Sequence, residues 1–487
     1  MSDLHTVSAV ELARRIRDGE LSPVRAVDAH IARIEAVDRA INAVVVPRFA
    51  DARREARNAA ARIKRTKRRD RLPPFLGVPC TVKELLAVEG MPWTAGVVAR
   101  RHVTAPSDGP LVQRLRGAGG IVLGLTNVSE AGLWLESENP IYGRTNNPHD
   151  VTRMAGGSSG GEAAIIAAGG SPMGIGADIG GSIRNPSFFN GICGHKPTGG
   201  LLPSIGHWPP AEGQRGRYCV SGPMARTVED MVAMMEVFSP EDDPHRDPGR
   251  GPFRRAEGLR PEDITVHWFE SNGMTPADDE VRADVRRTAD GLAGMGFRVE
   301  EWRPPGMPLS FALWLAKVSS TGDPSVRELL GNSHAISLRR ELANAFFGRS
   351  RHSPGALFLA ALDSFGSKAP GWTRPFVAFA DRMRERIEAR LGDRGVLLCP
   401  VYPRAAPRHR RPLLSPLAFA YCGVFNILEM PATAVPTGPG RDGLPLGLQV
   451  AGPRFSDALT LYVAEHIERW SGGCRIAPAA PLRRERS

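Results

Sequence analysis

The amino-acid sequence predicts an α/β protein, because helical and strand-like segments alternate along it. Residues 111–116 have a helical pattern that ends at a run of glycines, and residues 121–125 then form a short apolar strand. Further along, a strand at 264–269, an amphipathic helix at 278–295 and a strand at 297–302 follow the same alternation. This order is typical of a sheet covered by helices.

The composition is that of an ordinary soluble globular protein. The chain has 487 residues, of which 42% are hydrophobic and 24% charged. No segment reaches the roughly 18 apolar residues of a membrane span, and the N-terminus lacks a signal-peptide pattern. The six cysteines are scattered without a CxxC pair, which argues against a disulfide framework and a cysteine-ligated metal. We therefore expect a cytoplasmic protein with no metal and no other cofactor.

The net charge of +11 raises the question of an anionic partner. The excess is spread along the chain, and the one dense basic run, residues 62–71, has no interleaved aromatic residues. We interpret this run as a solvated helix end and loop, with a polyanion or membrane contact as the alternative. We expect no nucleic-acid partner.

Residues 1–72 are predicted to form a helical strap or an oligomer contact. Ser8 and Glu11 have the spacing of a capping box, and Ser22-Pro23 places a proline at the first position of a second helix. We divide the rest of the chain into a core with the catalytic motifs at 73–230, an α/β insertion at 231–390 and a C-terminal part of the core at 391–487.

Within the insertion, residues 340–366 are the hardest to interpret. Phe346 and Phe347 stand among arginines, and Leu357–Leu359 follow a Ser-Pro-Gly turn. Ordinary helical packing is one interpretation. An apolar cap over a substrate pocket and a hairpin that touches a membrane are the alternatives.

Two serine sites lie among glycines between residues 156 and 182. Such a density of glycine suits backbone that approaches a ligand closely or aims several N–H groups at one point. Ser159 and Glu162 have the capping-box spacing, which gives Ser159 a structural role at the start of a helix. Ser158 then lies just outside the helix N-terminus, where developing negative charge is favoured.

Ser182 is the candidate nucleophile, because it follows two glycines that let the N–H groups of residues 179–182 converge on one oxygen. A serine nucleophile needs a base. Lys83 ends the apolar strand predicted at 77–82. A lysine there is either a catalytic or paired group, or a surface lysine whose ammonium reaches solvent.

Other hydrolase chemistries fit less well. Ser159 lies in a Gly-x-Ser-x-Gly pattern, but residues 151–155 before it make a poor strand for a nucleophile elbow. His195, the nearest histidine in sequence, has no obvious carboxylate partner for a Ser-His-Asp site. The twelve histidines lack metal-site spacing, and neither glycine run matches the phosphate-binding loop.

Taken together, these motifs resemble the amidase signature family, and the resemblance covers about residues 8–470. It rests on Gly77–Glu84, Gly156–Gly161, Asp178–Arg184, Gly194–Thr198 and Gly443–Gln449. Residues 136–148 and 188–191 look most like the second type of the fatty-acid amide hydrolase branch. Bacterial urethanases belong to the same broad family.

The resemblance implies a large mixed central β-sheet with helices on both faces and a Ser–cisSer–Lys triad. Ser182 would be the nucleophile, Ser158 the bridging serine on a cis peptide, and Lys83 the base. The remaining implied site residues are the oxyanion donors Ile179, Gly180, Gly181 and Ser182, and Gly132 and Leu133 in the substrate-pocket wall.

The expected activity is hydrolysis of small-molecule amides, with carbamates and esters as further substrates, through an acyl-enzyme on Ser182. An amidase-like subunit of a tRNA-dependent amidotransferase and a Ser-His-Asp esterase are the alternatives. We expect a monomer or homodimer without a transmembrane segment, and leave a peripheral membrane contact open.

Overall fold

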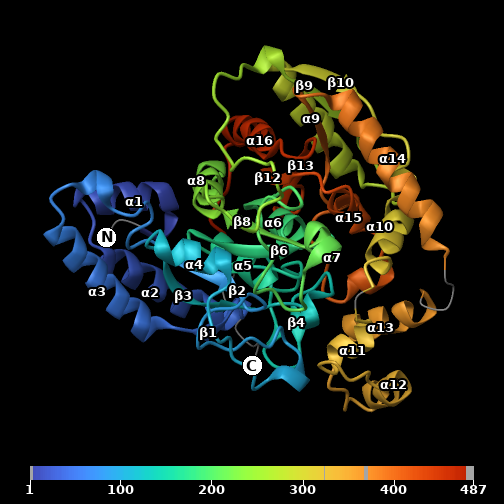
Figure 1. Cartoon of the computed structure of the whole chain (residues 1–487), viewed down its shortest axis with the longest axis horizontal. Helices are drawn as coiled ribbons and strands as arrows, with labels where there is room; N and C mark the ends of the chain where they lie inside the picture. Colours follow the sequence, from blue (N-terminus) through green and yellow to red (C-terminus); the bar gives the residue numbers. More distant parts are fainter. Residues whose placement is uncertain (1–3, 323, 367–370, 479–487) are drawn as a thin grey trace.

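The computed structural model describes residues 4–322, 324–366 and 371–478 (Figure 1). These residues form one sheet of eleven strands in the order β1-β3-β2-β6-β8-β7-β12-β13-β11-β9-β10, and a separate pair, β4 and β5. The strands are β1 Val44–Pro47, β2 Pro79–Lys83, β3 Ile121–Thr126, β4 Glu138–Asn139, β5 Gly143–Arg144, β6 Met173–Asp178, β7 Cys193–Lys196, β8 Val220–Ala225, β9 Thr265–Trp268, β10 Arg298–Glu301, β11 Gly395–Pro400, β12 Ala432–Pro439 and β13 Pro445–Ala451.

Helices flank this sheet (Figure 1). They are α1 Ala9–Asp18, α2 Pro23–Ile41, α3 Phe49–Arg65, α4 Pro110–Gly117, α5 Gly160–Ala167, α6 Arg184–Asn190, α7 Gly213–Tyr218, α8 Val228–Phe238, α9 Asp279–Gly294, α10 Ser310–Ser319, α11 Val326–Leu330, α12 Leu338–Phe346, α13 Pro354–Gly366, α14 Thr373–Leu391, α15 Ala420–Ile427 and α16 Asp457–Ser471.

Both faces of the sheet are buried. Successive side chains of a strand point to opposite faces. In β11, Val396 and Leu398 belong to the core shared with α9 and α16, whereas Leu397 and Cys399 belong to the core shared with α14 and α15. The sheet is therefore covered by helices on both sides, as the resemblance implied.

The mixed sheet brings the two segments that carry Lys83 and Asp178 together. β3, β2 and β6 are parallel neighbours, and most of the other pairs are antiparallel. Because parallel strands end at the same edge, the last residues of β2 and β6, Lys83 and Asp178, lie at one edge. Ligands of α/β sheets bind at such carboxyl ends.

The N-terminal segment contains one strand that was not expected, besides the expected helices α1, α2 and α3. Residues 1–72 were expected to be helical, but β1 runs antiparallel to β3 at the border of the sheet, with Val44 opposite Thr126. Three consecutive valines supply the β-branched side chains that suit a strand. The sheet also draws strands from all four predicted segments, so the division at residues 72, 230 and 390 stays a prediction.

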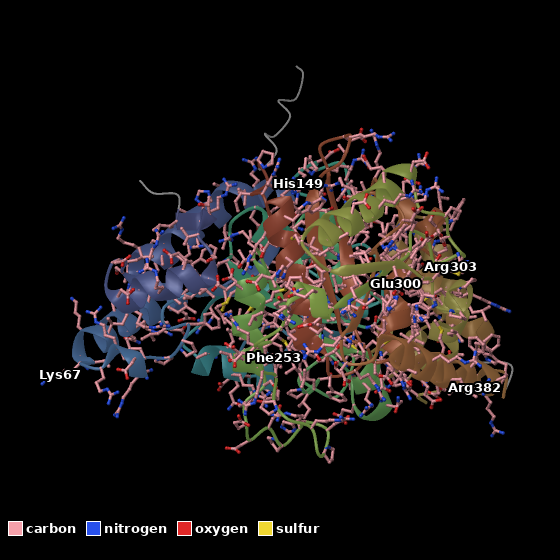
Figure 2. All side chains as sticks on the ribbon, turned by 90° about the horizontal axis from the view of Figure 1, so that it is seen from above. Lys67, His149, Phe253, Glu300, Arg303 and Arg382 are labelled. Carbon is pink, nitrogen blue, oxygen red and sulfur yellow. The ribbon has the colours of Figure 1, made fainter. Side chains whose placement is uncertain are left out.

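The basic run and the absence of a membrane span are the two expectations that concern the surface. The basic run at 62–71 forms the exposed end of α3 and the turn after it, and Figure 2 shows Lys67 at the outer edge of the molecule. Across residues 4–322, 324–366 and 371–478, no helix is both long and apolar enough to cross a membrane.

We predict that Leu398→Ala lowers the free energy of unfolding by about 2–5 kcal/mol, because it empties a fully buried position between β13 and β9. Urea unfolding followed by circular dichroism measures this loss. Leu414→Ala is the control: Leu414 is 73% exposed, so its removal should change stability by less than about 0.5 kcal/mol. Equal losses in the two variants would contradict the assigned core.

Candidate active site

Lys83 is buried at the end of β2. Its side chain is fully inaccessible to solvent, so the alternative of a surface lysine does not fit. The Nζ atom donates a hydrogen bond to Ser158 Oγ at 2.7 Å and another to the Ala177 carbonyl at 3.3 Å. The lysine therefore contacts one of the two predicted serine sites directly.

Burial changes the acid–base behaviour of Lys83. Loss of solvation lowers the pKa of Lys83 to about 7, although Cys219, Asp178 and Glu162 act in the opposite direction. A lysine with this pKa is partly neutral at neutral pH and can accept a proton, which an ordinary lysine cannot.

The peptide bond between Gly157 and Ser158 is cis. Residue 157 has no room for a side chain, because a Cβ there would lie 2.5 Å from the Trp134 carbonyl and 2.6 Å from Ser129 Oγ. Glycine at 157 thus lets the chain pass against the 129–134 loop and aim Ser158 at Lys83.

The capping-box expectation for Ser159 is wrong. Ser159 stands at the N-cap position of α5, but its side chain makes no capping bond and lies against the backbone of Ala177 instead. Ser137 Oγ accepts from the Gly160 N–H at 2.8 Å and caps the helix from outside. Glu162 is turned away into the core, where it accepts hydrogen bonds from the hydroxyls of Thr81 and Thr126.

Ser182 lies in the loop between β6 and α6 and is 8% exposed. Its carbonyl accepts a hydrogen bond from the Ser159 N–H at 3.2 Å. This bond joins the two glycine-rich serine sites, so the loop that carries Ser182 is held beside the residue that follows Ser158.

A buried ion pair shapes this loop. The carboxylate of Asp178 accepts the N–H groups of Gly181 and Ile183 at 2.6 and 3.1 Å, and the Arg184 Nε at 3.0 Å. Burial alone would raise the pKa of Asp178, but the charge and hydrogen bonds of Arg184, with one from Asn426, hold it well below its usual value.

The ion pair also bears on the predicted oxyanion donors. Because the Gly181 N–H is directed at Asp178, it holds the loop rather than facing a substrate. A Cβ at Gly181, where φ is +107°, would lie 2.5 Å from the Asn185 side chain, so the turn requires glycine. The N–H groups of Ile179, Gly180 and Ser182 remain as candidates.

Gly132 and Leu133 lie at the end of a short 3-10 turn, Glu130–Gly132. A Cβ on Gly132 would stand 3.7 Å from Ser158 Oγ, which places this turn next to Ser158. Leu133 is partly buried and packs against the main core. The structure thus brings both residues to the site, and their role in binding stays a prediction.

Sequence reasoning missed the contact between this turn and residues 340–366. The buried carboxylate of Glu130 binds His352 Nδ1 and accepts the Ser353 N–H, both at 2.7 Å. Gly355, at the start of α13, lies so close to Trp134 that a Cβ there would be 2.3 Å from the ring. No local pattern links residues so far apart in sequence.

His195 does not complete a Ser-His-Asp site with the glycine-rich serines that the structure describes. Contrary to the expectation, His195 does have a carboxylate partner, since Nε2 lies 3.1 Å from Asp457 Oδ1. Its other nitrogen, Nδ1, lies 2.9 Å from the hydroxyl of Thr433, so both ring nitrogens are engaged away from the serine loops. Across the part of the chain that the structure describes, no cluster of His, Cys, Asp and Glu could hold a metal ion.

Comparisons with known proteins extend these observations. The family model described as Amidase matches residues 25–461. The chain is 39% identical to fatty-acid amide hydrolase 2-A of Danio rerio over 96% of this chain and 89% of that protein. It is 32% identical to an acylamidase of Rhodococcus erythropolis, covering 96% of each. A solved structure of 6-aminohexanoate cyclic dimer hydrolase complexed with substrate has a TM-score of 0.78 and 26% identity, covering 98% of this chain and 99% of that chain.

The pKa of Lys83 leads to a prediction about Ser182. A protonated Lys83 cannot take a proton, so labelling of Ser182 by a fluorophosphonate should rise about tenfold per pH unit below pH 7 and level off above it. Lys83→Met should label slowly and lose this inflection. Lys64→Met, at an exposed position, is the control and should keep the wild-type profile. The same inflection in Lys83→Met would exclude Lys83 as the base.

Proposed function

Because the chain belongs to the amidase family, we propose that it hydrolyses carboxylic amides through an acyl-enzyme on Ser182. The observation that carries this proposal is the buried Lys83, whose Nζ lies 2.7 Å from the Oγ of Ser158, on a cis peptide beside the Ser182 loop. This is an activated-nucleophile arrangement that needs no metal ligand.

In the proposed mechanism, one proton moves from Ser182 through Ser158 to Lys83, and one then returns along this relay. As Ser182 Oγ attacks the substrate carbonyl carbon, its proton passes to Ser158 Oγ, and the proton of Ser158 passes to the neutral Nζ of Lys83. The return of a proton along the same path protonates the leaving amine as the C–N bond breaks. Water then attacks the acyl-enzyme by the same relay and releases the carboxylic acid.

The negative charge on the carbonyl oxygen needs fixed donors. We assign this role to the N–H groups of Ile179, Gly180 and Ser182, and a positioning role to Gly181, whose N–H is bonded to Asp178. Preorganised backbone donors of this kind are worth about 10²–10³ in rate for each donor lost.

The residues beside Ser158 support an apolar substrate class. Gly132 ends the turn next to Ser158, Leu133 and Trp134 follow it, and Trp134 packs edge-to-face against Phe358 of α13, with 5.7 Å between ring centroids. These side chains favour apolar acyl or amine groups, as do the names of the relatives. We include aryl carbamates and esters as substrates, because the same serine attack applies to them.

The chain is proposed to act in the cytoplasm as a monomer or homodimer, without nucleic acid. Within the described part of the chain, no two cysteines form a disulfide, as is usual in a reducing compartment.

We predict that Ser182→Ala lowers kcat for a short anilide and a long-chain fatty amide by about 10³-fold or more, because no acyl-enzyme can form. The purified chain alone, without ATP or other subunits, should be active, and a trapped substrate should add its acyl mass to wild type. Ser159→Ala is the matched control and should still form the acyl-enzyme. An active Ser182→Ala, or a strict need for ATP and partner subunits, would refute the proposal.

A peripheral membrane contact is the second part of the proposal. On α12 and just after it, Phe346 and Phe347 are 86% and 70% exposed. Arginines flank them at exposed positions: Arg339, Arg340, Arg349 and Arg351. Figure 1 shows α12 at the lower right edge of the molecule, on the other side from α1–α3. Aromatic side chains ringed by arginine suit the interface of an anionic bilayer.

We predict that the chain co-sediments with phosphatidylcholine vesicles that contain phosphatidylserine. The double variant Phe346→Ser/Phe347→Ser should bind them at least about tenfold more weakly, because each phenylalanine side chain contributes about 1.5–3 kcal/mol when buried. Leu414→Ser, at another exposed apolar position, is the control. Equal sedimentation of the double variant and wild type would refute the membrane contact and would leave the proposed amide hydrolysis unaffected.

A further inference from the structure

The first peptide of the Ser182 loop is held from outside the loop. Trp314, in α10, donates its indole Nε1–H to the carbonyl oxygen of Ile179 at 2.8 Å. The two residues are 135 positions apart in sequence. Ile179 follows the last residue of β6, and Gly180 comes next, so this hydrogen bond acts on the peptide group between them.

That peptide group carries one of the proposed oxyanion donors. In a trans peptide the carbonyl of one residue and the N–H of the next point in opposite directions within one plane. Fixing the Ile179 oxygen therefore fixes the direction of the Gly180 N–H. Glycine at 180 would otherwise let this peptide rotate at low cost, because it lacks the Cβ that restricts its dihedral angles.

Aromatic rings close one side of the loop at the same point. Trp314 packs edge-to-face against Phe419, with ring centroids 4.8 Å apart. A Cβ built on Gly180 would lie 3.1 Å from the Phe419 ring and 3.6 Å from Trp314 Nε1. Both rings thus lie on the side of Gly180 that its absent side chain would occupy, and only glycine fits there without displacing them.

The helix that carries Trp314 is itself anchored. Lys317, one turn further along α10, is nearly buried and donates to Asp381 of α14 at 2.7 Å. Its ammonium also lies 5.7 Å from the centre of the Tyr218 ring. These contacts fix the rotation of α10. The indole N–H therefore has a defined direction, whereas the N–H of a mobile surface tryptophan has none.

We propose that Trp314 is a positioning residue for the reaction: its indole N–H holds the Ile179–Gly180 peptide so that the Gly180 N–H faces the substrate oxyanion. The inference rests on the proposed acyl transfer at Ser182. It makes α10, which lies in the predicted insertion, a part of the machinery that stabilises the transition state.

The test uses the full chain and a short anilide. Trp314→Phe keeps an aromatic ring against Phe419 but removes the donor. We expect kcat to fall about tenfold while KM stays within about twofold. Deleting an oxyanion donor lowers kcat by about 10²–10³-fold, and a donor that is only loosened should lower kcat less. Trp302→Phe, whose ring packs against His267, is the control and should keep the wild-type kcat.

A second replacement separates the hydrogen bond from packing. Benzothienylalanine in place of Trp314 has the same bicyclic shape with sulfur where the N–H was. It should show the same loss of kcat, with a thermal unfolding midpoint near that of wild type. Wild-type kcat in this variant, or a loss confined to KM, would overturn the inference. If wild type itself hydrolysed no amide, carbamate or ester, the proposed function would fail instead, so the two failures are distinguishable.

Discussion

The buried ion pair between Asp178 and Arg184 is the interaction on which the candidate site depends. Two charges without solvent are tolerated only when hydrogen bonds satisfy them. Here Asn426 and Gln449, from the C-terminal part of the chain, complete the set, with Arg184 donating to both side-chain oxygens. The loop that carries Ser182 therefore takes its shape only when β6, α15 and β13 have assembled around it.

The same low-dielectric surroundings have opposite effects on neighbouring groups. Asp178 stays ionised because its partner is bonded to it, whereas burial lowers the pKa of Lys83 and raises that of Glu162 to about 7. Among the described residues, Glu162 accepts hydrogen bonds from two hydroxyl groups and from no cation. The site thus combines one ion pair that fixes the geometry of the Ser182 loop with a lysine whose pKa burial lowers, and the proposed relay needs both.

Local patterns in the sequence singled out Lys83 at a strand end and Ser158 and Ser182 in glycine-rich loops, and the family resemblance then assigned their roles. The structure confirms the contact between Lys83 and Ser158, while the roles of all three stay a prediction. The contacts that the sequence did not predict are made between residues that are distant in sequence. Ser137, not Ser159, caps α5, and Asp457 reaches His195 from 262 positions away. Spacing rules describe a single helix or turn, and contacts made by the finished sheet lie outside them.

The bond between Glu130 and the segment before α13 links the outer surface of the molecule to the turn beside Ser158. A carboxylate that binds two donors cannot shift without breaking or dragging both. Movement of α13 is therefore transmitted to Ala131 and Gly132. A substitution in the segment before α13 can therefore shift the turn at residues 130–132 without changing a residue of the serine loops or Lys83.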